Sequence, residues 1–382
     1  MVKAGRMATR LTIEQVNSWR LTRHHLVHRA DRKEIAKIVS DACGIQAQVL
    51  SAAELAIRAR VEGLCEQDVR AAMWKYRTIL KTWCMRGSVH LLARADLPLY
   101  VAALKTKLAE SARWLQKDGQ VTPEEIETIT EAVGRALTGR TLTREQLSKE
   151  VERIADLSPR AKRYLMSAWG ILLRPAAYQG MLAFGESVGP LVTFVRPDLR
   201  DLCGSDLSAL DALLKLFRRF LSSYGPATIG DFTHWWGSLS DEYRSGLERY
   251  DEGLVEVETE GHRVLMLEAD ADAASGLGPL HVLRLLPSFD CYAMLYSPRE
   301  RFVPDIYRGR IFRAAGWNYP TIMADGVAIG IWGFRKRGRG VVIELEPFRP
   351  FNAREKKSIQ EEVADIGKFL DISISCTLPG IR

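Results

Sequence analysis

The sequence has few cysteines, and their spacing excludes two common uses of that residue. None of the six stands in a C-x-x-C pair or near a histidine at zinc-ligand spacing. A disulfide framework and a structural zinc site are therefore not indicated, and we expect reduced, mostly buried thiols, as in a cytoplasmic protein. The six are Cys43, Cys65, Cys84, Cys203, Cys291 and Cys376.

Long apolar runs are also missing. No stretch of about 18 consecutive apolar residues occurs, so we expect no membrane span. The opening residues, MVKAGRMATR, carry charge but lack the apolar segment of a secretory signal. The sequence therefore predicts a cytoplasmic protein without a membrane partner.

Metal-ligand patterns are equally scarce. His24, His25 and His28 crowd one predicted helix end, but they lack the acidic or cysteine companions of a metal site. We interpret them as a polar or DNA-facing helix end. The clustered carboxylates that a metal-dependent nuclease needs are not found either. We therefore expect no metal and no cofactor.

A modest basic excess is present. The 382 residues have a formal net charge of +7 and a pI of about 9.1, and 47% of them are hydrophobic. This charge permits nucleic-acid binding without establishing it. The length suffices for two to four small domains, each with a core of its own.

One pattern, helices followed by a β-hairpin, occurs three times along the chain. Helices followed by a hairpin form the winged helix-turn-helix, a DNA-binding fold. Three in tandem, without a signal for dimerisation, favour a monomer that wraps one DNA duplex. We therefore predict an α+β protein with three tandem winged helix-turn-helix domains and a small C-terminal β-domain. The predicted boundaries are 1–118, 119–203 and 204–275 for the winged helices and 276–382 for the β-domain, with hairpins at 79–92, around 184–195 and at 254–268.

Three further segments complete the prediction. A single helix is expected over 158–173, a linker over 269–278 and a closing helix over 353–370. Exposed cations on these elements are candidates for contacts with DNA phosphates. One set, here called the hairpin cations, stands at a predicted hairpin tip, and two arginines stand on the helix at 158–173. The hairpin cations are Arg335, Lys336, Arg337 and Arg339, and the helical arginines are Arg160 and Arg163.

Two glutamines one residue apart, Gln46 and Gln48, lie between predicted helices. In a helix, residues i and i+2 point in nearly opposite directions, whereas in an extended segment they face the same side. If the two amides act together, the chain there must be extended or distorted. On spacing alone, they are also compatible with ordinary surface residues in a turn.

Four stretches in one order resemble a known family. They are LTIEQVNSWRLTRHHL, GIQAQ, TWCMRGSVHLLARADLP and LRLLPSFDCYAMLY. The sequence resembles the AlkZ and YcaQ family of winged-helix DNA glycosylases, which unhook DNA interstrand crosslinks, from about residue 11 to residue 348. The signature of that family is Gln, an apolar residue and then Gln, or Asp in the YcaQ-like branch. Gln46-Ala47-Gln48 is similar to the Gln–Gln branch, so the resemblance implies that Gln46 and Gln48 are catalytic.

The chemistry of an amide pair limits what it can catalyse. A carboxamide is no general base near pH 7, but it can hold a water and direct its carbonyl dipole at a developing positive charge. Such help suffices when the leaving group is already good, as a cationic N7-alkylguanine is. If the pair is catalytic, the residue type thus points to cationic alkylated bases as substrates. The motif contains no lysine, so a Schiff-base lyase is not indicated and a monofunctional glycosylase is expected. The resemblance implies double-stranded DNA with alkylated or crosslinked guanine as substrate, and the hairpin cations near the minor groove.

Two alternatives stay open at this stage. A non-catalytic winged-helix transcription regulator would share the fold and the charge, and base release from N7-methylguanine DNA would distinguish it from an enzyme. His90 and Asp290 lie within the resembling stretches, and each has either a structural hydrogen-bonding role or a chemical one. The resemblance to a DNA repair family also places the protein in the cytoplasm, at the nucleoid.

Overall fold

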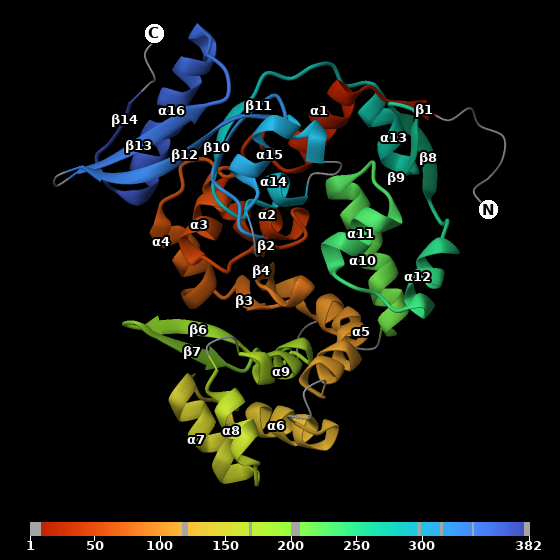
Figure 1. Ribbon diagram of the computed structural model, residues 1–382, viewed down its shortest axis with the longest axis vertical. Coiled ribbons are helices and arrows are strands. Elements are labelled where there is room, and N and C mark those ends of the chain that lie inside the picture. The colour runs from red at the N-terminus through yellow and green to blue at the C-terminus, as the bar shows by residue number, and fades with distance from the viewer. Residues whose placement is uncertain are drawn as a thin grey trace. The chain divides into compact units, whose positions relative to one another are not determined.

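The computed structural model describes residues 9–116, 121–167, 170–199, 207–295, 299–313, 316–337 and 340–377, and it has a mixed helix and strand architecture (Figure 1). The chain divides into two compact units, each built from segments that are distant in sequence. The first contains residues 1–72, 218–232 and 249–382, and the second contains residues 73–217 and 233–248. Among the described residues, none of the helices has both the length and the apolar character needed to span a bilayer.

The first unit begins with short helices, and the first of them has a clear N-terminal cap. Thr12 and Gln15 form a reciprocal capping box at the start of α1, as their spacing predicts. Gly44 has a φ of 92° after α2, which is a left-handed conformation that favours glycine at a helix end. The elements here are β1 (Thr9–Arg10), α1 (Ile13–Arg23), α2 (Ile35–Asp41), β2 (Ile45–Gln46), α3 (Leu50–Arg58) and α4 (Glu66–Arg70).

A hairpin from later in the chain completes the core around α1. Strands β8 (Leu254–Thr259) and β9 (His262–Leu267) pair antiparallel, and β1 joins β8 in parallel. Val16 and Trp19 of α1 pack with Val257 and Met266 of this hairpin in one apolar cluster. The N-terminal helix therefore depends on a hairpin more than 200 residues further along the chain for the burial of its apolar face.

The C-terminal part of the first unit is a five-stranded sheet in the order β10-β11-β12-β13-β14 (Figure 1). Its first four strands are antiparallel neighbours, and β14 adds to β13 in parallel. Helix α16 packs against β10 and β14, and its bounds agree with the predicted closing helix. The elements are β10 (Leu283–Leu286), α14 (Cys291–Leu295), α15 (Asp305–Ile311), β11 (Thr321–Ala324), β12 (Val327–Arg337), β13 (Gly340–Pro347), α16 (Ala353–Leu370) and β14 (Ile374–Thr377).

The second unit combines helices with two hairpins. Trp83, Phe184 and Phe194 bring the hairpins together, with ring centroids 4.6 to 6.1 Å apart. Gly170 has a φ of 61°, and a Cβ there would stand 2.5 Å from the Trp83 ring, so both backbone and space require glycine. The elements are β3 (Ile79–Trp83), β4 (Val89–Ala93), α5 (Leu97–Gln116), α6 (Pro123–Ala136), β5 (Leu142–Thr143), α7 (Arg144–Ile154), α8 (Pro159–Leu165), α9 (Arg174–Tyr178), β6 (Ala183–Val188), β7 (Leu191–Val195) and α12 (Asp241–Glu248), while α10 (Ala209–Tyr224) and α11 (Ile229–Trp236) belong to both units.

Three local predictions were wrong. The segment 269–278 is not a linker, because most of it lies in helix α13 (Glu268–Ser275), where Ala271 and Ala274 pack into the core around α1. The single helix over 158–173 stops at Leu165, and the chain turns at left-handed Gly170 before α9. His24 is not a DNA-facing residue, because its side chain is buried between the rings of Tyr224 and Tyr292.

Candidate functional site

The glutamine pair begins on a short strand and ends in a bend. Gln46 ends strand β2 and is partly buried, and Gln48 is exposed in the bend that leads into α3. Ile45 and Ala47, which alternate with them, are fully buried. This alternation of buried and accessible side chains is compatible with two amides on the same side of the segment.

The turn before the pair is held by charged and polar contacts. The carboxylate of Asp41 bridges two side chains, with His25 Nε2 at 2.7 Å and the ammonium of Lys37 bonded to the same oxygen. Burial alone would raise the pKa of Asp41, but the hydrogen bonds from His25 and Lys37 lower it below the usual range. An ionised carboxylate therefore fixes the end of α2, directly ahead of the glutamines.

The last turn of α10 forms two hydrogen bonds with the same segment. Tyr224 donates its hydroxyl to the carbonyl of Ala42 at 2.8 Å, and Ser223 donates to the carbonyl of Asp41. Ala42 is almost completely buried, so its carbonyl group needs a protein partner. A helix from the third predicted domain thus supports the backbone that carries Gln46.

At the other end of α3, two buried arginines tie the chain to the C-terminal part of the unit. Arg60 and Asp290 are both 0% exposed and form a bidentate ion pair at 2.7 and 2.9 Å. Burial alone would lower the pKa of Arg60, but the charge of Asp290 raises it above its ordinary value. Asp290 also accepts the backbone N–H of Tyr292 at 2.9 Å. Asp290 is thus a buried carboxylate with both oxygens hydrogen-bonded.

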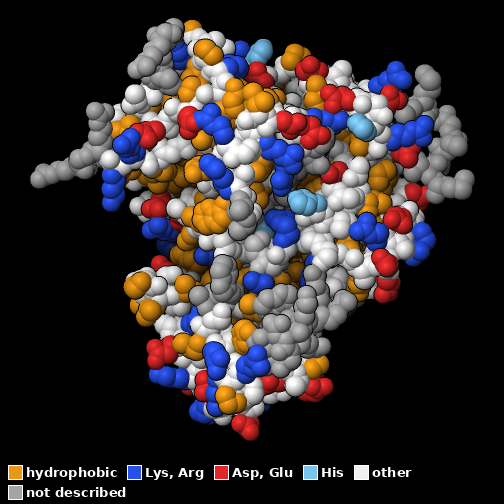
Figure 2. Space-filling model, in the orientation of Figure 1, with side chains coloured by type: hydrophobic (Ala, Val, Ile, Leu, Met, Phe, Trp, Pro, Cys, Tyr) orange, Lys and Arg blue, Asp and Glu red, His pale blue; other side chains and the backbone are white. Residues whose placement is uncertain are grey.

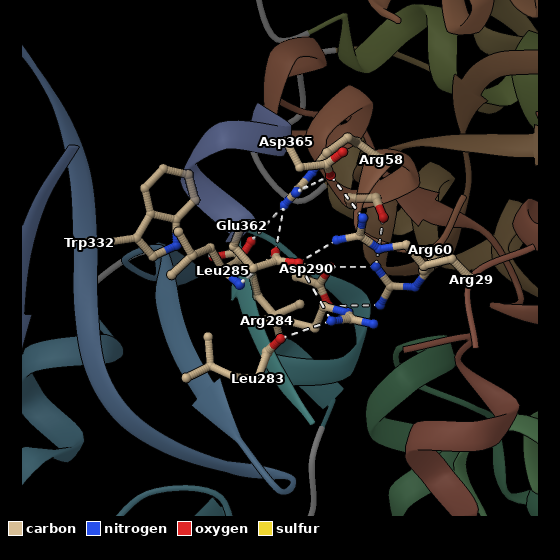
Figure 3. Close-up of polar contacts among 12 residues, drawn as sticks. Arg29, Arg58, Arg60, Leu283, Arg284, Leu285, Asp290, Trp332, Glu362 and Asp365 are labelled. Carbon is tan, nitrogen blue, oxygen red and sulfur yellow. Dashed lines mark hydrogen bonds and ion pairs between the residues drawn. The ribbon is translucent and has the colours of Figure 1, made fainter. Parts of the chain in front are cut away.

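A second group, which we call the arginine cluster, surrounds two carboxylates of α16 (Figure 3). Arg58 bonds to Asp365 at 2.8 Å and to Glu362 at 3.0 Å. Arg29 reaches the same two carboxylates, and Arg284 lies 3.5 Å from Glu362. Burial alone would raise the pKa of Asp365, but the charges of Arg58 and Arg29 lower it. The cluster therefore fastens α16 to the helix that follows the glutamine pair.

His90 lies in the second unit, on β4, and is 2% exposed. Burial and the charge of Arg86 lower the pKa of His90 to about 3. Its ring is therefore neutral near pH 7, and its Nδ1 lies 3.1 Å from the carbonyl oxygen of Ser88. A neutral, buried imidazole bonded to the backbone fits the structural role that the sequence left open.

The structure describes only some of the cations that were predicted to contact DNA. Arg335 and Lys336 are exposed on β12, and Arg335 lies 2.5 Å from Glu344 across the hairpin. Arg160 and Arg163 are exposed on α8 in the second unit. Arg339 and the side chain of Arg337 lie outside the described residues. Lys and Arg side chains alternate with Asp and Glu over the face seen in Figure 2, so charge alone does not mark a DNA surface there.

Among the described residues, no group of three or more His, Cys, Asp or Glu side chains is arranged to hold a metal ion. The turn that precedes Gln46 and Gln48 is held by contacts from Tyr224 and Asp41.

Comparison with known proteins defines the class. A family model described as "AlkZ-like: DNA glycosylase AlkZ-like" matches residues 39–369, which include both glutamines, Arg60 and Asp290. The protein is a DNA glycosylase, which favours the enzyme over the transcription regulator.

A curated protein and a solved structure, both from Streptomyces sahachiroi, agree with this class. The chain is 30% identical over 376 residues to a Streptomyces sahachiroi protein named "Interstrand DNA cross-link repair glycosylase", covering 94% of this chain and 96% of that protein. The solved structure of "Streptomyces sahachiroi DNA glycosylase AlkZ" matches with a TM-score of 0.83 at 28% identity, over 97% of this chain and 100% of that one. The chain belongs to the AlkZ-like DNA glycosylase family.

Proposed function

We propose that the protein hydrolyses the N-glycosidic bond of cationic N7-alkylguanine in double-stranded DNA and unhooks interstrand crosslinks made through such bases. The observation that carries this proposal is the pair formed by Gln46 at the end of β2, partly buried, and Gln48 in the following bend, exposed. The printed name of the Streptomyces relative, an interstrand crosslink repair glycosylase, supports the same substrate class.

In the proposed mechanism, the two amides position the attacking water and direct carbonyl dipoles at the sugar as it gains oxocarbenium character. An amide does not titrate near neutral pH, so it neither removes nor supplies a proton in the rate-limiting step. The alkylated base is already cationic and leaves as a neutral molecule when its bond to the sugar breaks. Water then bonds to the sugar carbon and releases one proton to the solvent. Preorganised dipoles are effective because they need no rearrangement when the charge develops. The anchoring of the turn by Tyr224 and Asp41 supplies that preorganisation.

We also propose the domain plan that the sequence predicts: winged helices at 1–118, 119–203 and 204–275, followed by the β-domain at 276–382. The hairpins β3–β4, β6–β7 and β8–β9, each preceded by helices, support it. In this plan the protein acts as a monomer on one duplex, and the hairpin cations together with Arg160 and Arg163 contact phosphates. The hairpin of β12 and β13 follows the minor groove.

The test is release of base from duplexes that contain either N7-methylguanine or a defined N7 crosslink. We expect Gln46→Ala and Gln48→Ala each to reduce the excision rate by roughly 10²–10³, the loss typical for one positioned dipole. Duplex affinity should change little, because neither side chain is charged. Gln67→Ala, a glutamine on α4 of the same unit, is the matched control. Wild-type activity in both site variants would refute the assignment.

A further inference from the structure

A turn between α4 and β3 holds two cations and a tyrosine side by side in solvent. Its residues are Lys75, Tyr76 and Arg77, all three of them exposed, and we call them the tyrosine turn. Tyr76 is 65% exposed, the highest value of any Phe, Trp or Tyr among the residues that the structure describes. Neither the proposed mechanism nor the proposed phosphate contacts involve this turn.

The backbone on both sides of the turn is anchored, so the exposure of Tyr76 does not come from a loose segment. Met73 before the turn is 1% exposed, and Ile79 after it is 0% exposed. The carbonyl of Thr78 accepts the backbone N–H of Arg94 at 2.9 Å, which ties the turn to the residue that follows β4. The fold therefore holds the tyrosine ring out in solvent.

The segment also has two uncommon backbone conformations. Its first part is a single π-helical turn, η2 (Ala71–Lys75). Arg77 has a φ of 53°, in the left-handed region that residues other than glycine rarely adopt. Isolated π-turns and left-handed residues of this kind are unfavourable on their own, and both occur preferentially at functional sites.

The two cations of the turn are not neutralised by ion pairs. Among the described residues, none forms an ion pair with Lys75 or Arg77. Arg70, in the helix just before the turn, is instead bonded to Glu66 at 2.7 Å. The ammonium of Lys75 lies 5.2 Å from the centre of the Tyr76 ring, a cation–π contact that keeps the charge at the turn. The turn thus presents two positive charges and a phenol hydroxyl to a partner.

We propose that the tyrosine turn binds the phosphate backbone of duplex DNA. A single exposed aromatic residue is common on protein surfaces, but this one stands between two unpaired cations on an anchored, strained turn of a DNA glycosylase. Lys, Arg and Tyr side chains all donate to phosphate oxygens in complexes with DNA. In this proposal Lys75 and Arg77 pair with phosphates, and the hydroxyl of Tyr76 donates to a phosphate oxygen. The inference rests on the proposed function, because it takes duplex DNA as the substrate.

The test measures the Kd for an undamaged duplex against salt concentration by fluorescence anisotropy. Lys75→Ala and Arg77→Gly should each lower the log–log salt slope by about 0.9, and the double variant should lower it by about 1.8. Glycine suits the left-handed backbone at position 77, so this change removes the charge without harming the fold. Tyr76→Phe should weaken binding roughly 10-fold at unchanged slope, the loss expected for one hydrogen bond to a charged group.

Matched variants separate a specific contact from a general effect of charge. Arg77→Lys should keep the wild-type slope, because it keeps the charge. Lys149→Ala should also keep it, since the Lys149 side chain is 75% exposed in the same unit but is paired with Glu145. A slope lowered equally by Lys149→Ala would overturn the proposal.

Two further outcomes would also contradict it. An unchanged slope in the double variant would mean that the turn does not contact DNA, and an acidic protein surface would then be the partner that matches its charge. Wild-type affinity in Tyr76→Phe would remove the tyrosine from the contact. Binding to an undamaged duplex requires no excision, so failure of the catalytic proposal would appear in base release and failure of this one in the salt slope.

Discussion

Replacing Asp290 with alanine tests whether this residue supports the fold or takes part in the chemistry. The change removes a carboxylate that is 0% exposed and leaves the Arg60 guanidinium, also 0% exposed, without its bidentate partner. Arg60 would keep only its bond to the Ala56 carbonyl at 2.8 Å and its contact with Cys291. The backbone N–H of Tyr292 would lose its acceptor as well. The variant therefore leaves the buried charge of Arg60 without a charged partner.

The magnitude follows from the burial of both partners. Breaking a fully buried ion pair by removing one partner costs about 3–5 kcal/mol, because the remaining charge is uncompensated. With an unfolding entropy of about 2.1 cal/mol/K per residue, the whole chain would lose roughly 4–6 °C in Tm if it unfolds as one unit. At temperatures below the Tm of the variant, the folded variant should excise N7-methylguanine at a rate close to that of the wild type.

The assay pairs thermal unfolding with single-turnover excision at a temperature where both proteins are folded. A double variant, Arg60→Met with Asp290→Leu, is the control, because replacing a buried pair by apolar residues of similar size is often neutral or stabilising. It should recover most of the lost Tm. Unchanged stability of Asp290→Ala together with abolished excision would refute the structural role and assign Asp290 to the chemistry.

Three further predictions concern the glutamines, the hairpin and acid stability. Gln48→Asp should retain excision, because a carboxylate also holds water and resembles the YcaQ-like signature; a folded but inactive variant would show that neutrality at this position matters. Alanine at all four hairpin cations should lower the log–log salt slope of duplex binding by about 0.9 per lost phosphate contact. Lys357→Ala, a cation 79% exposed on α16, is the control there, and an unchanged slope would place the hairpin in solvent. Because burial lowers the pKa of His90 from 6.5 to about 3, the unfolded chain binds more protons between these values, so folding stability should fall as pH drops through this window. His90→Phe should flatten that fall in denaturant titrations at several pH values, and a parallel dependence in both proteins would contradict the assignment.

Sequence reasoning succeeded where the structure is locally determined. The cap at Thr12 and the closing helix are encoded within a few residues, so pattern alone predicts them. At the glutamines the spacing supported only a conditional prediction, extended or distorted backbone if the two amides act together, and the structure has a two-residue strand followed by a bend there. The catalytic roles of the two glutamines stay predictions.

Long-range contacts could not be predicted. Strand β1 has only two residues, and no sequence pattern near it predicts that it pairs in parallel with the strand that contains Val257. Helix α13 has the small, acidic composition of a linker, and only packing on α1 makes it a helix. The arginine cluster escaped notice for the same reason, since buried arginines look like surface residues in a sequence. The hydrogen bond of Tyr224 could not be predicted either, because its partner is the backbone carbonyl of Ala42, and no side chain marks a backbone acceptor in a sequence.

The arginine cluster also sets the order in which the protein can mature on the ribosome. Arg58 leaves the ribosome 304 residues ahead of Glu362, its partner in the folded chain. At about 5–20 residues per second, this separation corresponds to roughly 15 to 60 s of synthesis. Over that interval the arginines stay hydrated, because burying them without the carboxylates would be too unfavourable. Helix α3, which follows the glutamine pair, is therefore fixed to α16 only late in translation. A truncated product that ends before α16 would contain Gln46 and Gln48 but would lack the ion pairs that hold α3 in place.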